Sequence, residues 1–241
     1  MNADSGKSPV VWVTGASRGI GRAIAAAFAR DGGRVAVSAR SANALAQCAR
    51  EIGGEGLICE AVGCDVRLST SVAAAHSEIV QKLGPVDILV NNAGVMVAAA
   101  VADLSEEEFD DLIATNLRGA FLCTKAVLPS MIERHRGHIF MISSVAARTW
   151  FRKNGGYSAS KAGLSALASV LREEVREHGI KVTNVYPGAT ASGLWSDRVL
   201  ERYSDRMMHP NDVGCLLVSL YRQPDRALVE EVILRPVGGD L

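Results

Sequence analysis

Short apolar runs alternate along this chain with longer segments in which small and apolar residues recur at helical spacing. The apolar runs are rich in valine and isoleucine, and we expect them to be strands; they cover residues 10–14, 34–39, 57–62, 86–91, 138–143, 181–186 and 231–236. Segments with helical period cover residues 21–33, 41–52, 69–83, 105–134, 157–178 and 210–221. Strands that alternate with helices build a parallel sheet with helices on both faces. The pattern therefore predicts an α/β fold with one doubly wound sheet of about seven strands.

The length of 241 residues suits one domain that spans residues 1–241, and no internal repeat or linker divides the chain. The polar residues 1–8 are expected to be flexible. Ser105 is followed by acidic residues, which is typical of a helix N-cap and first turn.

Lysine plus arginine equals aspartate plus glutamate, at 26 each, so the chain lacks the net charge typical of a nucleic-acid or anionic-membrane binder. The first eight residues do not resemble a signal peptide, and no apolar segment approaches the roughly 20 residues that span a bilayer. We expect a soluble, cytoplasmic protein that binds neither nucleic acid nor membrane.

Five scattered cysteines and five histidines form no ligand-spaced cluster, so the sequence encourages neither a disulfide framework nor a metal site.

Three glycines, Gly15, Gly19 and Gly21, lie between the first predicted strand and the first predicted helix. Such a turn can bring backbone N–H groups up to a phosphate, although their spacing differs from the standard dinucleotide fingerprint. The alternative is a plain strand-to-helix turn.

The second predicted strand ends in Ala39 and Arg40, where an NAD-binding sheet usually carries an acidic residue. Arg40 and Arg18 could form charge-assisted bonds to a 2′-phosphate, so the sequence favours NADP over NAD. The alternative is that both arginines are ordinary surface residues.

Tyr157 and Lys161 lie four positions apart within "GGYSASKAG", so a helix would place them on one face. A nearby ammonium is expected to lower the pKa of Tyr157 from its usual value near 10, which would make the phenol a general acid and base. Taken alone, such a pair is more often a surface feature.

The motifs "TGASRGIG" (14–21), "NNAG" (91–94), Asn116 in "TNLRG", Ser144 in "ISS" and "YSASK" (157–161) occur in this order. With them the chain resembles the short-chain dehydrogenase/reductase family, and 3-oxoacyl-[acyl-carrier-protein] reductases in particular. The resemblance implies a Rossmann-type sheet with strand order 3-2-1-4-5-6-7. It also implies a homotetramer or homodimer built through helices 105–134 and 157–178.

The resemblance implies that Asn116, Ser144, Tyr157 and Lys161 are catalytic, with Ser143 as the adjacent alternative to Ser144. In the family, an asparagine at this position holds a water that relays protons to the lysine. The implied cofactor-binding residues are Gly15, Ser17, Arg18, Gly19, Ile20, Gly21, Arg40, Asp65, Val66, Asn92, Ala93, Gly94, Tyr157, Lys161, Pro187, Gly188 and Thr190.

Two further segments bear on the substrate. Residues 145–156 carry Arg148, Arg152 and Lys153 beside aromatic residues, which suggests a pocket for a substrate with an apolar body and an anionic group. The alternative is a basic surface loop. Residues 192–210 follow the sixth strand and could form a lid containing a short amphipathic helix.

The sequence thus predicts an NADP(H)-dependent oxidoreductase that acts on a small-molecule carbonyl or secondary alcohol, such as a 3-oxoacyl thioester. A 3-hydroxyacid or sugar-alcohol dehydrogenase is an alternative. A non-catalytic NADPH-binding regulator is an alternative from another class, although a pure sensor has no need of a proton donor.

Overall fold

The computed structural model describes residues 8–54 and 56–240, which build one parallel sheet. Its strands are β1 (Val10–Thr14), β2 (Arg34–Ala39), β3 (Cys59–Gly63), β4 (Ile88–Asn91), β5 (Gly137–Ile142), β6 (Ile180–Pro187) and β7 (Glu231–Leu234). Every neighbouring pair is parallel, in the order β3-β2-β1-β4-β5-β6-β7. The predicted fold class and strand order are confirmed, and the carboxyl ends of all strands meet at one edge.

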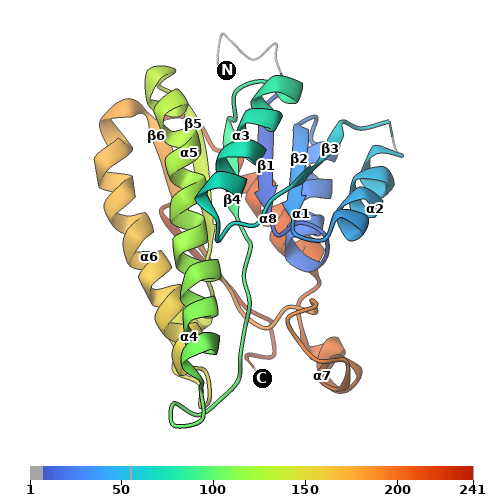
Figure 1. Ribbon diagram of the computed structural model, residues 1–241, viewed down its shortest axis with the longest axis vertical. Helices are drawn as coiled ribbons and strands as arrows, with labels where there is room; N and C mark the ends of the chain where they lie inside the picture. Colours follow the sequence, from blue (N-terminus) through green and yellow to red (C-terminus); the bar gives the residue numbers. More distant parts are fainter. Residues whose placement is uncertain (1–7, 55, 241) are drawn as a thin grey trace.

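Helices cover both faces of this sheet (Figure 1). They are α1 (Gly19–Arg30), α2 (Ala42–Gly53), α3 (Ser69–Leu83), α4 (Glu106–Ile113), α5 (Gly119–Glu133), α6 (Gly155–Val175), α7 (Asp197–Tyr203) and α8 (Pro210–Tyr221). One core lies between the sheet and α3, α5 and α6, and the other between the sheet and α1, α2 and α8. Alternating residues of β1 serve the two cores: Val10 and Trp12 face the first, and Val11 and Val13 face the second.

The segment 105–134, predicted as one helix, is divided. Helix α4 begins with a capping box in which Ser105 and Glu108 bond each other's backbone N–H, as the acidic first turn indicated. Five residues, Ala114–Arg118, then form a π-helical turn before α5 continues. The wider turn leaves the chain direction intact, so helical period alone does not reveal it.

The predicted helix 157–178 also differs at its ends. Helix α6 begins two residues earlier, at Gly155, and its last part is a 3₁₀ turn at Arg176–His178. The expectation of flexibility for residues 1–8 concerns residues outside the described part, apart from Ser8. Within the described residues, no helix is both long enough and apolar enough to cross a membrane.

Candidate active site

Two adjoining cavities lie at the carboxyl edge of the sheet. The larger has a volume of about 640 Å³ and the smaller about 300 Å³. They share five lining residues, which are Ile20, Asn92, Gly94, Ser192 and Leu194. In open α/β sheets ligands bind at this edge, so the two cavities together form the candidate site.

Every residue that the sequence suggested for cofactor binding lines one of these cavities. The larger cavity is lined by Gly15, Ser17, Arg18, Gly19, Ile20, Gly21, Arg40, Asp65, Val66, Asn92, Ala93 and Gly94. The smaller is lined by Ser144, Tyr157, Lys161, Pro187, Gly188 and Thr190, besides the shared Ile20, Asn92 and Gly94. Among the suggested catalytic and cofactor-binding residues, Asn116 alone lines neither cavity.

The glycine turn between β1 and α1 requires glycine for two reasons. Gly15 and Gly19 have φ values of 63° and 58°, a left-handed conformation that other residues rarely adopt. A Cβ on Gly15 would also lie 2.6 Å from Cα of Ala93. The first residues of α1 line the larger cavity, and no side chain among the described residues caps this helix N-terminus, so its N–H groups can bind an anion there.

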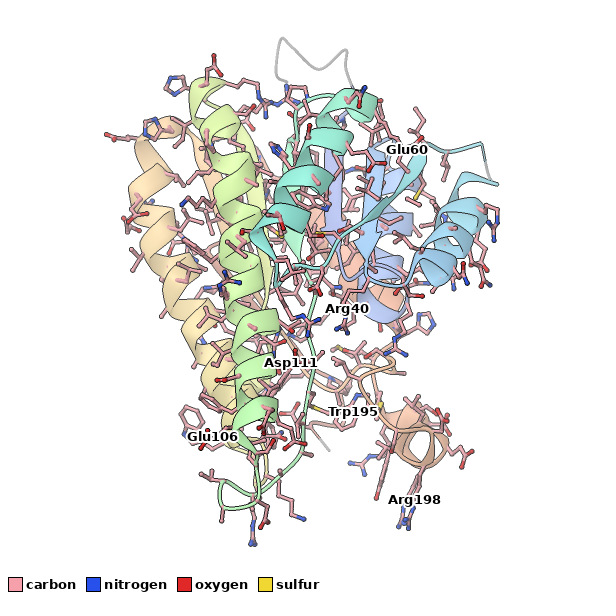
Figure 2. The ribbon with its side chains drawn as sticks, in the orientation of Figure 1. Arg40, Glu60, Glu106, Asp111, Trp195 and Arg198 are labelled. Carbon is pink, nitrogen blue, oxygen red and sulfur yellow. The ribbon has the colours of Figure 1, made fainter. Side chains whose placement is uncertain are left out.

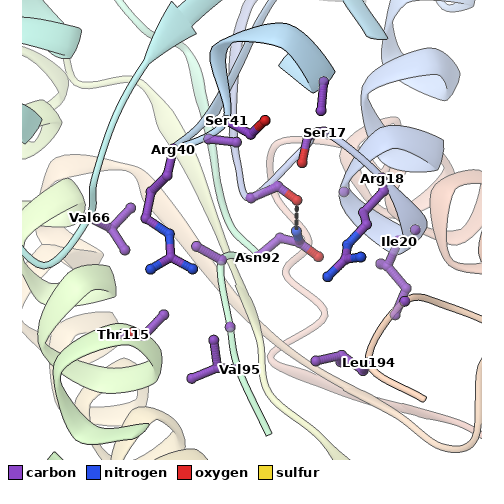
Figure 3. Close-up of a pocket in the computed structure, with 18 of the residues that line it drawn as sticks. Ser17, Arg18, Ile20, Arg40, Ser41, Val66, Asn92, Val95, Thr115 and Leu194 are labelled. Carbon is purple, nitrogen blue, oxygen red and sulfur yellow. Dashed lines mark hydrogen bonds between the residues drawn. The ribbon is translucent and has the colours of Figure 1, made fainter. Parts of the chain in front are cut away.

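Asn92 fastens this turn to the end of β4 (Figure 3). Its Nδ2 donates to the carbonyl oxygens of Thr14 and Gly15, at 2.9 and 3.1 Å. In return, Thr14 Oγ1 accepts from the backbone N–H groups of Asn92 and Ala93, at 3.0 and 3.1 Å. The side chain of Asn92 is therefore engaged in holding the wall of the cavity.

Arg18 and Arg40 stand on opposite sides of the larger cavity (Figure 3). Both are exposed, and neither guanidinium has a hydrogen-bond partner within residues 8–54 and 56–240. Arg18 also lies against the segment after β6, since a Cβ on Gly193 would be 2.9 Å from its Nε. These two exposed arginines give the cavity positive charge and suit it to a phosphate.

Asp65, by contrast, is already paired. Arg67 contacts it through Nε and Nη2, at 3.0 and 2.8 Å, and reaches Asp111 at 2.7 Å through Nη1. The hydrogen bond from Arg67 holds the pKa of Asp65 below its ordinary value. Sequence reasoning missed Arg67 and Thr115 as lining residues, since neither belongs to a recognisable motif.

The smaller cavity brings together Ser144 after β5 and Tyr157 and Lys161 on α6. Tyr157 and Lys161 are 7% and 4% exposed, and the Lys161 ammonium is 5.8 Å from the Tyr157 ring centroid. Lys161 Nζ donates to the carbonyl oxygen of Ile142 at 2.8 Å. The pair is therefore a buried cluster rather than a surface feature.

Burial controls the protonation of this pair. It raises the pKa of Tyr157, and a hydrogen bond with Ser144 acts in the opposite direction without cancelling it. It also lowers the pKa of Lys161 to about 8. The expected lowering of the Tyr157 pKa is therefore wrong for this structure, because burial disfavours the charged phenolate more strongly than the neighbouring groups favour it.

Asn116 occupies the π-helical turn, which explains an asparagine inside a long helical segment. Its Oδ1 accepts from Val95 N at 2.8 Å, and its Nδ2 donates to Val95 O and Ser160 Oγ, both at 2.9 Å. A Cβ on Gly94 would lie 3.2 Å from Asn116 Oδ1 and 3.5 Å from Lys161 Nζ. Asn116 thus lies directly behind the cavity wall at Lys161.

The adjacent serines after β5 have different partners. Ser144 Oγ accepts from Ala146 N at 3.1 Å and hydrogen-bonds Tyr157. Ser143 Oγ instead donates to the carbonyl oxygen of Lys161, at 3.1 Å. Of the two serines, Ser144 is therefore the one joined to the tyrosine.

The three basic residues of the loop after Ser144 do not act together. Arg148 stacks on Tyr186, with 4.2 Å from its Cζ to the ring centroid, and forms an ion pair with Glu231. Arg152 lines the smaller cavity, whereas Lys153 does not. The idea of an anion-binding loop therefore depends on Arg152 alone.

The segment 192–210, expected to form a lid, contributes Leu194 and Trp195 to the smaller cavity, whereas Asp240 was not found from the sequence. Trp195 lies at the carboxyl edge of the sheet, and its Nε1 donates to Thr190 O at 3.0 Å. Arg198 of α7, by contrast, points away from the molecule (Figure 2). Asp240 reaches the cavity from the C-terminal segment and pairs with Arg235 at 3.0 Å. No periodic pattern marks such irregular segments. Within the described part of the chain, no group of three His, Cys, Asp or Glu side chains could hold a metal.

Comparison with known proteins agrees with this geometry. A family model described as short chain dehydrogenase matches residues 9–202. Sepiapterin reductase from Chlorobaculum tepidum is 38% identical over 239 residues, which cover 96% of this chain and 98% of that protein. Among solved structures, a metagenomic short-chain oxidoreductase in complex with NADP is 36% identical with a TM-score of 0.84, covering 95% of this chain and 97% of its own.

A second solved structure, a variant of actinorhodin polyketide ketoreductase with NADPH, is 32% identical with a TM-score of 0.89. The match covers 95% of this chain and 96% of the ketoreductase chain. The fold, the placement of the motif residues and these matches agree along nearly the whole sequence. The chain belongs to the short-chain dehydrogenase family and is one of its oxidoreductases.

Proposed function

We propose that this protein is an NADP(H)-dependent carbonyl reductase, which transfers hydride between the nicotinamide and a carbonyl compound or its secondary alcohol. One observation carries the proposal. A cavity with a glycine turn and two exposed arginines opens into a second cavity with a buried tyrosine, serine and lysine.

The residues of the larger cavity fit the phosphate-bearing part of the cofactor. The uncapped N-terminus of α1 binds the pyrophosphate, and Arg18 and Arg40 bind the 2′-phosphate from two sides. Asp65 and Val66 border the adenine, with Asp65 held in place by Arg67. The NADP and NADPH in the two similar solved structures support this choice of cofactor.

The residues of the smaller cavity hold the nicotinamide and the reacting carbonyl. Pro187, Gly188 and Thr190 line the nicotinamide side, and Lys161 binds the adjoining ribose. When bound, the reduced cofactor supplies the hydride to the carbonyl carbon.

Tyr157 donates the proton in this reaction. Because burial raises its pKa, the phenol keeps its proton at neutral pH and can donate it to the carbonyl oxygen as a general acid. Ser144 hydrogen-bonds the same oxygen, and Lys161 and Asn116 behind it form the route by which the proton is replaced. In the direction of alcohol oxidation, Tyr157 accepts the proton.

The substrate is proposed to be a small or extended carbonyl compound, such as a 3-oxoacyl thioester. The cavity of about 300 Å³ is lined by the apolar side chains of Met96, Phe151, Leu194 and Trp195. Residues 192–210, which contribute Leu194 and Trp195, act as its lid. Arg152 at the cavity remains the candidate partner of an anionic group.

The reaction is proposed to take place in the cytoplasm, where the five unpaired cysteines would stay reduced. A homodimer or homotetramer is proposed to form through the segments 105–134 and 157–178. The long helices α5 and α6 in these segments lie side by side and expose Phe121 and Val170.

The test is consumption of NADPH and of NADH with a panel of 3-oxoacyl thioesters, 3-oxoacids, aldehydes, diketones and sepiapterin. We expect turnover with NADPH well above that with NADH. Tight NADPH binding without turnover of any carbonyl would favour the non-catalytic regulator. Turnover only of 3-hydroxyacids or sugar alcohols would favour the alternative dehydrogenase.

A further inference from the structure

Lys161 is bound through its backbone and its side chain by Ile142, the last residue of β5, and by Ser143, the next residue. Its ammonium donates to the carbonyl oxygen of Ile142, at 2.8 Å. Its own carbonyl oxygen accepts from the hydroxyl of Ser143, at 3.1 Å. Ile142 and Ser143 therefore bind the side-chain tip and the backbone of Lys161, respectively. These two contacts restrict the conformation of the side chain between them.

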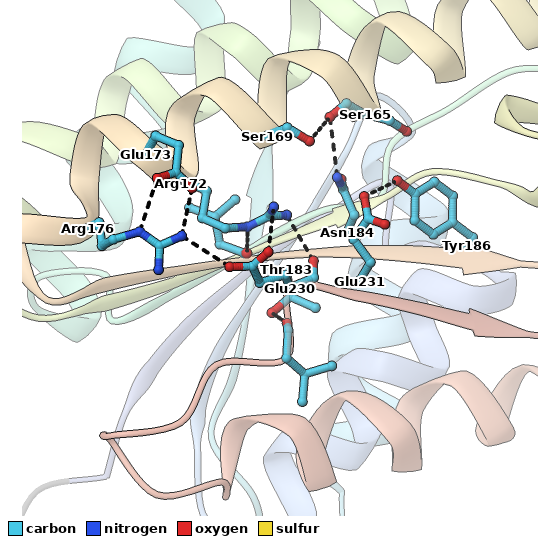
Figure 4. Close-up of polar contacts among 12 residues, drawn as sticks. Ser165, Ser169, Arg172, Glu173, Arg176, Thr183, Asn184, Tyr186, Glu230 and Glu231 are labelled. Carbon is cyan, nitrogen blue, oxygen red and sulfur yellow. Dashed lines mark hydrogen bonds and ion pairs between the residues drawn. The ribbon is translucent and has the colours of Figure 1, made fainter.

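Ser165, one turn further along α6, completes this attachment. Its hydroxyl donates to the carbonyl oxygen of Lys161 at 2.9 Å, and it lies 2.9 Å from Ser143 Oγ. The carbonyl oxygen of Ser165 in turn accepts from Asn184 Nδ2 of β6, at 3.3 Å (Figure 4). The two serines thus join α6 to β5, and Asn184 extends the contact to β6.

The contact is more specific than the ordinary back-bonding of a helical serine. Ser169 shows the ordinary case, since its hydroxyl donates to Ser165 O at 3.0 Å, four residues earlier in the same helix (Figure 4). Ser165 makes the same local bond and additionally contacts the hydroxyl of Ser143, the residue that follows β5. Ser143 is 4% exposed, so its hydroxyl depends on these partners rather than on water.

We propose that Ser143 and Ser165 are positioning residues that set the Lys161 ammonium relative to Tyr157 and the cofactor ribose. The proposal rests on the proposed function of Tyr157 and Lys161. Neither serine is required to touch the substrate; both act through the placement of the lysine.

The proposal predicts a particular change in pH dependence. Alcohol oxidation requires the ionised tyrosine. Burial raises the pKa of Tyr157, and within the proposal the Lys161 ammonium opposes this effect only as long as it is held close to the phenol. When Lys161 is less firmly placed, the phenolate is less stabilised, so the apparent pKa of oxidation rises. A general loss of stability would lower the melting temperature and leave this pH midpoint where it was.

The experiment compares Ser143→Ala with Ser169→Ala, using the alcohol that corresponds to the best carbonyl substrate of the panel. For Ser143→Ala we expect kcat to fall about tenfold at neutral pH, with the alcohol KM within about twofold. The pH midpoint of kcat should rise by about half a unit, and NADPH binding measured by tryptophan fluorescence should weaken. Ser169→Ala loses a hydroxyl of the same kind in the same helix and should behave as wild type.

If Ser143→Ala fails to fold, two variants of Ser165 provide the test instead. Ser165→Ala should shift the pH midpoint in the same direction, and Ser165→Thr should restore it, because threonine keeps the hydroxyl that bonds the carbonyl four residues earlier. In the double variant with Ser143→Ala and Ser165→Ala, the shift of the pH midpoint should be smaller than the sum of the two single shifts, because the serines share one contact.

An unchanged pH midpoint in folded Ser143→Ala and Ser165→Ala proteins would overturn the proposal, as would an equal shift in Ser169→Ala. A Tyr157→Phe variant with full activity would instead overturn the proposed function. The two failures are therefore distinguishable.

Discussion

Lys161 and Tyr157 show how burial and function conflict at single residues. Both side chains lie in the interior, where charge is unfavourable, and yet the proposed reaction uses a cation beside a titrating phenol. Burial raises the pKa of Tyr157 and lowers that of Lys161 to about 8. Replacing this ionisable pair with apolar side chains would therefore increase the free energy of unfolding.

Replacing Lys161 with methionine should stabilise the protein by about 2 kcal/mol at pH 7, while activity is lost. The pKa of Lys161 is lowered on folding, so the unfolded chain binds the additional proton between about pH 8 and the unfolded value near 10.5. Stability of the wild type therefore rises across this window, and the advantage of Lys161→Met should shrink there. Urea unfolding at pH 7 and pH 10 checks this; a destabilised variant at pH 7 would contradict it.

Arg40 carries the predicted preference for the phosphorylated cofactor. Arg40→Ala should raise the KM for NADPH about tenfold or more and leave that for NADH within about twofold, because one charge-assisted bond is lost. Steady-state kinetics with both cofactors measures the ratio. Arg226→Ala, which removes an exposed arginine outside the cavities, is the control. Equal losses with the two cofactors would argue against a phosphate contact.

At the scale of elements, the strands were predictable because apolar runs rich in valine and isoleucine mark them directly. The glycine turn and the Tyr157 helix were predictable for a similar reason, since each motif lies within one short segment. The ion pair of Arg148 was not predicted because its partner Glu231 is 83 residues away in the sequence. Asp240 was not predicted as a cavity residue because the C-terminal segment has no regular spacing of apolar residues. Contacts between distant segments leave no local pattern.

The contribution of the π-helical turn to stability can be tested at two adjacent residues, Asn116 and Thr115. Asn116→Ala removes bonds to both backbone groups of Val95 and to Ser160, and should destabilise the protein by about 2 kcal/mol. Its neighbour Thr115 has a buried hydroxyl without a partner within residues 8–54 and 56–240, so Thr115→Val should be neutral or stabilising. Thermal unfolding of the two variants compares adjacent positions of one turn, and similar losses in both would refute this assignment.

At the scale of the whole molecule, helices α5 and α6 each expose a large apolar side chain. Phe121 of α5 is 44% exposed, and Val170 of α6 is 58% exposed. Such a surface is typical of a subunit interface.

Phe121→Glu should shift the protein toward smaller species in light scattering coupled to size exclusion, because it buries a charge in the proposed interface. Val80→Glu changes a comparably exposed apolar residue on α3 and should leave the assembly intact. A wild-type protein that is monomeric at all concentrations tested would contradict the predicted oligomer.

The most direct test of the proposed chemistry compares wild type, Tyr157→Phe and Tyr221→Phe in NADPH binding and in carbonyl reduction. Tyr221 packs against Phe28 in the other core, so its variant controls for the loss of a phenol hydroxyl elsewhere. We predict that all three bind NADPH with similar affinity, and that only Tyr157→Phe loses turnover, by at least about a hundredfold. Full turnover by Tyr157→Phe, or NADPH binding without turnover by the wild type, would contradict the assignment of these two cavities to carbonyl reduction.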